Sequence, residues 1–137
     1  MTQIEIATRG RGLYDITDAV GGAVARDGGQ ARLAVLFVRH TSCSLLVQEN
    51  ADPDVRHDLE AFFGRFVPDA DAPSMDYLTH RAEGPDDMPA HIKAALLPVS
   101  LSIPVERGRL ALGTWQGIYL YEHRTRPHRR RIALSLI

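Results

Sequence analysis

The pattern of hydrophobic and polar positions predicts an α+β domain rich in antiparallel strands. Apolar residues recur at helical spacing over 15–26, 53–66 and 88–97, which indicates about three helices. Most of the other apolar residues form short runs bounded by Gly, Pro or charged turns, as β-strands do. We therefore expect one domain over 1–137, built as an antiparallel-rich β-sandwich or a strongly curved mixed sheet.

Two predicted strands differ in the burial expected of their faces. Residues 32–38 are almost all apolar, so we expect a central strand that is covered on both faces. Residues 99–105 alternate strictly between apolar and polar or proline positions, so one face of this strand should contact solvent. A turn at 106–109 should lead into a returning strand that starts at Leu110.

The second predicted helix has a clear start and is followed by a long loop. Asp52 can cap the helix, and Pro53 fits the first helical position. The stretch 67–85 contains many Pro, Asp, Ala and Gly residues, which indicates a surface loop. A loop of this length in a small domain is often functional or acts as a lid.

Composition argues against several classes of protein. The formal net charge is −1, so no overall field favours nucleic acid or an anionic membrane. No apolar run approaches the roughly 20 residues of a membrane-spanning helix, and residues 1–7 are too polar for a signal peptide. The one cysteine, Cys43, rules out an internal disulfide and is expected to be a small buried side chain. We expect a cytoplasmic protein that binds neither nucleic acid nor membrane.

Three polar sets lie at the ends of predicted elements. They occupy 40–44 after an apolar strand, 86–91 at a helix start, and 113–124, where a glycine-rich segment continues as a buried strand. Glu122 stands out in the last set, because a buried carboxylate without a partner is costly and therefore needs a partner or a ligand. Together the three sets suggest one pocket assembled from distant segments.

Each candidate histidine has a functional and a structural interpretation. His40 is either a general acid/base, with Thr41 and Ser42 donating to a substrate oxygen, or an exposed strand-end residue. His91 lies near a helix N-terminus, where the positive end of the helix dipole favours the neutral imidazole. It would then serve as a base, a hydrogen-bond donor or a metal ligand, or be a partly exposed first-turn residue. His80, in the long loop, has weaker support.

The remaining motifs give less support for specific chemistry. No His-Glu-x-x-His, cysteine-pair or EF-hand spacing is present, so a metal site would have to combine distant residues. Five arginines lie within 124–131; they either bind phosphate or form a solvated hairpin.

Three long segments resemble the YjbQ family, also called UPF0047 and secondary thiamine-phosphate synthase. They are HTSCSLLVQENADPDV at 40–55, DMPAHIK at 87–93 and GRLALGTWQGIYLYEHR at 108–124, and the resemblance runs in order over essentially the whole chain. It implies a compact β-rich α+β fold, assembled as a homotrimer with the pocket near the subunit boundary. The associated activity joins a pyrimidine diphosphate and a thiazole phosphate to give thiamine phosphate, as a side activity of a family whose physiological role is unsettled.

The resemblance also implies roles for individual residues. By motif match, His40, His91 and Glu122 fall on positions of the family's pocket. We predict catalytic roles for them, with the histidines acting on protons or facing the diphosphate and Glu122 orienting an imidazole or holding a cation. The substrate-binding positions are Thr41, Asn50, His80 and Gln116. Mg²⁺ or another divalent cation would stabilise the departing diphosphate, with Asp86, Asp87 or Glu122 as its carboxylates. The alternative is a non-catalytic binder of a small phosphorylated or carboxylated metabolite.

Overall fold

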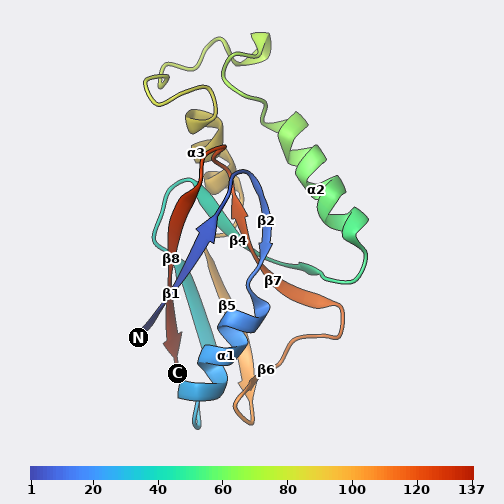
Figure 1. Cartoon of the computed structure of the whole chain (residues 1–137), viewed down its shortest axis with the longest axis vertical. Helices are drawn as coiled ribbons and strands as arrows, with labels where there is room; N and C mark the ends of the chain where they lie inside the picture. Colours follow the sequence, from blue (N-terminus) through green and yellow to red (C-terminus); the bar gives the residue numbers. More distant parts are fainter.

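A computed structural model describes all residues, 1–137, and arranges them as strands and helices around one layered core (Figure 1). The strands are β1 (Thr2–Thr8), β2 (Gly12–Asp15), β3 (Leu33–Val38), β4 (Cys43–Glu49), β5 (Ser100–Glu106), β6 (Arg109–Leu110), β7 (Gln116–Glu122) and β8 (His128–Leu136). The helices are α1 (Thr17–Asp27), α2 (Pro53–Phe66), α3 (Asp87–Leu96) and the short 3₁₀ helix η1 (Pro73–Met75). None of the helices is long and apolar enough to cross a membrane.

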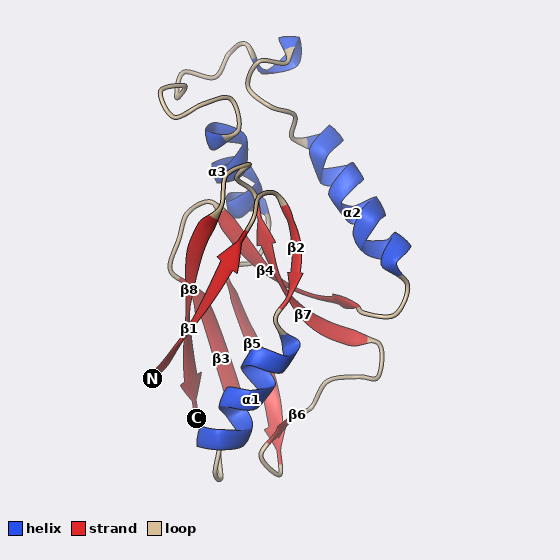
Figure 2. Cartoon of the chain, viewed as in Figure 1, coloured by secondary structure: helices blue, strands red, loops and turns tan.

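The strands form two antiparallel sheets (Figure 2). The larger sheet has the order β1-β8-β3-β5-β6, and the smaller one has the order β2-β7-β4. Every paired strand runs antiparallel to its neighbour. The α+β fold with a strongly curved, antiparallel-rich sheet and three α-helices is therefore confirmed.

The core lies between the inner faces of the two sheets and under α1. It combines alternate residues of five strands with one stripe of α1: Ile16, Val20, Ala23, Val24, Ala34, Leu36, Val38, Cys43, Leu45, Ile103, Val105, Ile118, Leu120, Ile132 and Leu134. Alternation decides which residues enter this layer, because successive side chains of a strand point to opposite faces. Cys43 is fully buried, as predicted, and burial raises the pKa of its thiol to about 12.

The strand over 32–38 is central, but only one of its faces is buried. β3 lies between β8 and β5, and its inner residues reach the core. The expectation that both faces are covered is wrong, because Phe37 on the outer face is 50% exposed. β5 does present a solvated face, as its alternation indicates. The turn after it places Arg107 and Gly108 at φ 52° and 73°, and the returning strand β6 is only two residues long.

α2 begins and ends where its sequence predicts, yet it packs differently from an ordinary amphipathic helix. Asp52 caps it by accepting the Asp54 N–H at 2.9 Å. No residue of α2 is buried, and Phe62 and Phe66 are 58% and 61% exposed. Figure 1 shows α2 held to one side of the sheets, where Phe63 meets the ring of Tyr121.

The segment 67–86 is more ordered than a plain surface loop. It contains η1, and its residues Val67, Ala70 and Met75 are buried. The Arg81 guanidinium donates to three backbone carbonyl oxygens of the same segment, at Ala70, Met75 and Leu78. These bonds hold the segment as an arch above α3 (Figure 1). The arm that returns to α3 contains His80, whose Nε2 lies 2.7 Å from Asp87 Oδ2 at the start of that helix.

Candidate functional site

The Glu122 carboxylate is fully buried and pairs with Arg130. Arg130 Nε donates to Glu122 Oε1 at 2.8 Å, and Arg130 Nη2 donates to Oε2. Thr8 Oγ1 donates to Oε1 at 2.6 Å, and the Arg124 N–H donates to Oε2. Burial by itself would raise the pKa of Glu122, but the hydrogen bonds from Arg130 and Thr8 outweigh it and hold the pKa below its usual value.

The Arg130 guanidinium also contacts Ser42, in addition to Glu122. Arg130 Nη2 donates to Ser42 Oγ at 2.9 Å, so the guanidinium links the start of β4 to the end of β7. Its side chain is 4% exposed, which corrects the interpretation of the arginines as a solvated hairpin at this position. The cation that Glu122 holds in this structure is thus a guanidinium within the protein.

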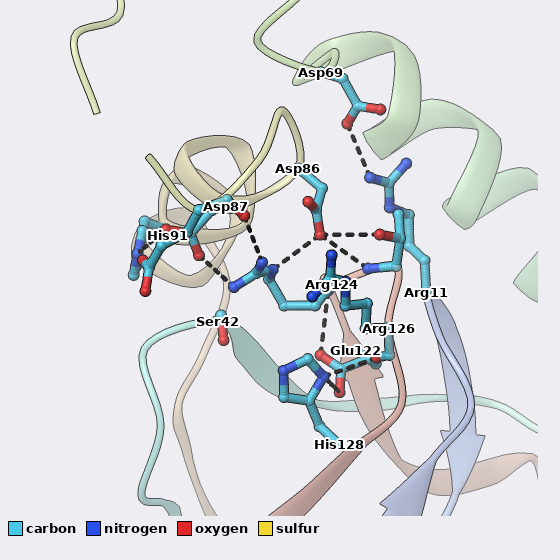
Figure 3. Close-up of polar contacts among 12 residues, drawn as sticks. Arg11, Ser42, Asp69, Asp86, Asp87, His91, Glu122, Arg124, Arg126 and His128 are labelled. Carbon is cyan, nitrogen blue, oxygen red and sulfur yellow. Dashed lines mark hydrogen bonds and ion pairs between the residues drawn. The ribbon is translucent and has the colours of Figure 1, made fainter. Parts of the chain in front are cut away.

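Arg124 connects the β7–β8 turn to the start of α3 (Figure 3). Its Nε donates to Asp86 Oδ2 at 2.9 Å, and its Nη1 donates to Asp87 Oδ1 at 2.6 Å. Burial would raise the pKa of Asp86, but hydrogen bonds from the Thr125 N–H and Arg124 lower it to about 2. Asp86 Oδ2 thus accepts from Arg124 and from Thr125, whereas Asp87 is the carboxylate that also faces the histidines.

Asp87 stands between two imidazoles. Its Oδ2 lies 2.7 Å from His80 Nε2 and 3.3 Å from His91 Nε2. α3 begins at Asp87, so His91 follows it by one helical turn and shares its face. Asp87 is 2% exposed. Burial would raise its pKa, but hydrogen bonding to His80 and the charge of Arg124 hold it below the usual value.

His91 is oriented by the chain segment before β4. Its Nδ1 lies 3.0 Å from the Thr41 carbonyl oxygen, which can only accept, so Nδ1 carries the proton. Nε2 is consequently the atom presented to Asp87 and His80. The Thr41 side chain is itself exposed, and the contact that joins these two predicted residues uses the Thr41 backbone.

One ring nitrogen of His40 accepts a hydrogen bond from the backbone of β8. Its Nε2 accepts the Arg131 N–H at 2.7 Å, so Nδ1 carries the proton of the neutral ring. Burial, followed by the charges of Arg130 and Arg131, lowers the pKa of His40 below its usual value. His40 is therefore neutral at pH 7 and can donate a hydrogen bond through Nδ1.

A cavity of about 330 Å³ lies beside these two histidines. Its walls come from the end of β3, the 39–42 connection and α3, and its lining residues are Phe37, Val38, His40, Thr41, His91, Ala94, Ala95 and Val99. A larger hollow of about 480 Å³ lies over α2, but its lining has no histidine. An apolar cavity with a few convergent polar groups is the usual form of a small-molecule site.

Two predicted substrate-binding residues lie at the opposite end of the β4–β7 pair. Asn50 Nδ2 donates to the Gln116 carbonyl oxygen at 3.3 Å, and the Gln116 side chain accepts the Gly113 N–H. Glu122 pairs with Cys43 at one end of this ladder, and Gln116 pairs with Glu49 at the other. Seven strand residues separate the two ends by about 20 Å. One chain thus groups His40, Thr41, His80 and His91, but keeps Asn50 and Gln116 apart from them.

A second polar group is buried between the smaller sheet and α3, and the sequence analysis gave its residues no role. His123 is fully buried, its Nε2 lies 2.8 Å from Ser44 Oγ, and its Nδ1 has no partner. Lys93 of α3 is 1% exposed, and burial lowers its pKa to about 8. Burial also lowers the pKa of His123 to about 3, with the charge of Lys93 contributing. The apolar residues close to His123 and Lys93 in the sequence could have indicated that both side chains are buried.

Comparison with known proteins places the whole chain in one family. The model of the family described as UPF0047 protein YjbQ-like matches residues 2–137. The protein sll1880 of Synechocystis is 49% identical over 96% of this chain and 86% of its own length. YjbQ of Escherichia coli O157:H7 is 44% identical over 97% of this chain and 94% of its own length. A solved protein from Clostridium acetobutylicum, described as uncharacterized, is 34% identical, covers both chains completely and has a TM-score of 0.86. With a match that spans both sheets and all the helices, this chain belongs to the UPF0047 family of YjbQ-like proteins.

Proposed function

We propose that this chain is an enzyme that acts on a small phosphorylated metabolite in the cavity between β3 and α3. The family has no established function. The reaction implied by the resemblance of the three sequence segments is the joining of a pyrimidine diphosphate to a thiazole phosphate. The observation that carries the proposal is the meeting of apolar walls with two oriented imidazoles, His40 and His91, in one cavity. An apolar wall suits a heterocycle, and the polar end suits its phosphate groups.

The two imidazoles offer complementary groups to such a substrate. His40 presents Nδ1–H as a neutral donor. His91 lines the same cavity, with Nδ1 held by the Thr41 carbonyl oxygen and Nε2 beside Asp87. In the proposed reaction the thiazole nitrogen forms a bond to the pyrimidine methylene carbon. The carbon–oxygen bond to the diphosphate breaks, and the diphosphate leaves with the electron pair. A donor placed at the leaving oxygens stabilises the charge that develops there.

A non-catalytic binder of a phosphorylated or carboxylated metabolite is the rival function. The same cavity and the same His40 donor support it, because an anion in a partly dry site needs hydrogen bonds whether or not it reacts. The two functions differ in one respect: only the enzyme needs its polar groups to stabilise a transition state better than the bound substrate.

His40→Ala and His91→Ala are each expected to lower turnover by about 100-fold or more, since each removes a group positioned for proton transfer or charge stabilisation. The assay uses the purified full chain with both thiamine precursors and a divalent cation, and follows thiamine phosphate by chromatography. The thermal midpoint of each variant should stay close to that of the wild type. His57→Ala is the matched control, because His57 is an exposed histidine on α2, outside the cavity.

Three outcomes separate the alternatives. Turnover that both cavity variants lose supports the enzyme. Tight capture of another metabolite in a binding screen, without turnover of the precursors, supports the binder. Equal turnover in wild type and both cavity variants contradicts any role of these histidines in catalysis.

We also propose that the site is completed in a homotrimer. Asn50 and Gln116 are about 20 Å along β4 from the cavity of their own chain, so they can reach a cavity only in a neighbouring copy. The exposed rings of Phe62, Phe66 and Trp115 provide apolar surface for such contacts. A second copy of this chain would thus cover α2 and bring the separated substrate-binding residues to its neighbour's cavity.

Light scattering at micromolar concentration is expected to give three times the chain mass of 15.2 kDa. The double variant Phe62→Asp/Phe66→Asp should shift the mass towards that of one chain, because two charges would be buried in the contact. Tyr77→Asp is the control, since it changes an exposed aromatic residue on the 67–86 segment instead. A wild-type protein with the mass of one chain would contradict the trimer.

A further inference from the structure

Four potential metal ligands meet at the start of α3. His80, Glu83, Asp87 and His91 each offer one nitrogen or oxygen atom, and these atoms all lie within 4.8 Å of one another. They come from the returning arm of the 67–86 segment and from the first two turns of α3. No short sequence motif predicts this cluster, because His80 comes close to Asp87 and His91 only through the arch of 67–86 over α3.

The hydrogen bonds around the group leave two acceptor atoms, His91 Nε2 and Asp87 Oδ2, facing each other. Thr41 holds the proton of His91 on Nδ1, so Nε2 of the neutral ring carries a lone pair. That lone pair faces Asp87 Oδ2 at 3.3 Å, and the oxygen can only accept while it is ionised. Two acceptors in this position repel each other unless a proton or a metal ion lies between them.

The spacing of the donors matches the size of a small metal ion. Nitrogen or oxygen ligands about 2.0–2.1 Å from Zn²⁺ lie about 3.3 Å from one another in a tetrahedron. The separations here are 3.3 Å from His91 Nε2 to Asp87 Oδ2, 2.7 Å from His80 Nε2 to the same oxygen, and 3.5 Å from His80 Nε2 to Glu83 Oε2. Small side-chain rotations would accommodate an ion, since His80 and Glu83 are largely exposed.

Supporting contacts fix the other atoms of the group. Metal-bound histidines commonly donate their second nitrogen to a backbone carbonyl, as His91 does to Thr41. Asp87 directs Oδ1 to Arg124 at 2.6 Å, so Oδ2 is the oxygen that faces His80 and His91. Two of the four donors are thereby held in place before any ion arrives.

We propose that His80, Asp87 and His91 bind a first-row transition-metal ion, with Zn²⁺ as the best match, and that Glu83 or water takes the fourth position. Two imidazoles and a carboxylate form a donor set typical of catalytic zinc sites. Mg²⁺ fits this set poorly, because it takes oxygen ligands in an octahedron and keeps several waters. His91 also lines the cavity between β3 and α3, so the ion would lie at the wall of that cavity.

Metal binding can be measured without any substrate, so its outcome is independent of the proposed reaction. The purified full chain is treated with a chelator, dialysed and titrated with Zn²⁺ by calorimetry, and separately with Co²⁺ by visible absorption. We expect one equivalent of Zn²⁺ per chain and d–d absorption bands of Co²⁺ in a site with nitrogen ligands. Mg²⁺ at millimolar concentration should leave the Co²⁺ spectrum unchanged.

His80→Ala and His91→Ala are expected to weaken Zn²⁺ binding by about 100-fold or more, because each removes a ligand. His57→Ala, which changes an exposed histidine on α2, should bind as the wild type does. Circular dichroism of each apo variant checks that it is folded, and His80 is the safer position because its side chain is 47% exposed. The inference is overturned if the wild type binds neither Zn²⁺ nor Co²⁺, or if both ligand variants bind as tightly as His57→Ala.

Discussion

Glu122→Gln is expected to destabilise the protein by about 3–5 kcal/mol, because it leaves the Arg130 guanidinium buried without a countercharge. The neutral amide also loses half of its acceptor capacity in a place where Arg130, Thr8 and the Arg124 N–H all donate. Urea unfolding at pH 7, followed by circular dichroism and extrapolated to water, measures this loss.

The matched control is Glu5→Gln, which removes the exposed Glu5–Arg129 ion pair between β1 and β8. Exposed pairs contribute well under about 1 kcal/mol, so this variant should unfold almost as the wild type does. A loss for Glu122→Gln no larger than that of the control would contradict the structural importance of the buried pair.

The effect of Glu122→Gln should also depend on pH. The pKa of Glu122 lies below the usual 4.5, so the unfolded chain takes up a proton before the folded chain does. The stabilisation is therefore complete above pH 4.5 and is lost as the pH falls through the lower pKa of the folded state. The difference in unfolding free energy between wild type and variant should narrow over that acidic range.

Lys93→Met is expected to stabilise the protein at pH 7 by about 1–3 kcal/mol. The Lys93 side chain is 1% exposed, and burial is the main cause that lowers its pKa from 10.5 to about 8. A shift of this size corresponds to about 3 kcal/mol of unfavourable charge burial. Methionine keeps the length and the packing of the side chain and removes the charge.

The pH dependence gives an independent check of this second prediction. Between pH 8 and 10.5 the unfolded chain binds the Lys93 proton and the folded chain does not, so the wild type gains stability as the pH rises. The advantage of Lys93→Met should therefore shrink over that range. Lys93→Arg, which stays charged, should destabilise the protein both at pH 8 and at pH 10.5. A methionine variant less stable than the wild type at pH 7 would contradict the charge-burial explanation.

Local signals were sufficient to predict the three α-helices and most of the strands, but not β2, whose last residue, Asp15, was assigned to the first helix. The adjacent residues Asp52 and Pro53 identify the start of α2. The helix ends at Phe66, where the helical spacing of apolar residues also ends. The alternation over 99–105 predicted β5 and its solvated face. The resemblance over 40–55, 87–93 and 108–124 predicted the family that the comparisons confirm. Such signals act between residues a few positions apart, so the sequence alone was enough to recognise them.

Burial was predicted less well, because it depends on what packs against each element. The apolar run 32–38 indicated two covered faces, but no element of the chain covers the outer side of Phe37. The apolar stripe of α2 identified the helix, but it did not show that Phe62 and Phe66 would be exposed. Helical or strand periodicity identifies an apolar face without stating which surface will meet it.

The candidate site shows the same division between local and tertiary information. The sequence by itself determined that Glu122 needs a partner, and it placed Asp87 and His91 one helical turn apart. Only the tertiary structure decided that Arg130 is that partner, since the two residues belong to strands of different sheets. Only the arch of 67–86 brings His80 to Asp87, and only the β4–β7 ladder separates Asn50 from His91. The physical reason is that these contacts follow from chain reversal and sheet register, which depend on the packing of the whole core.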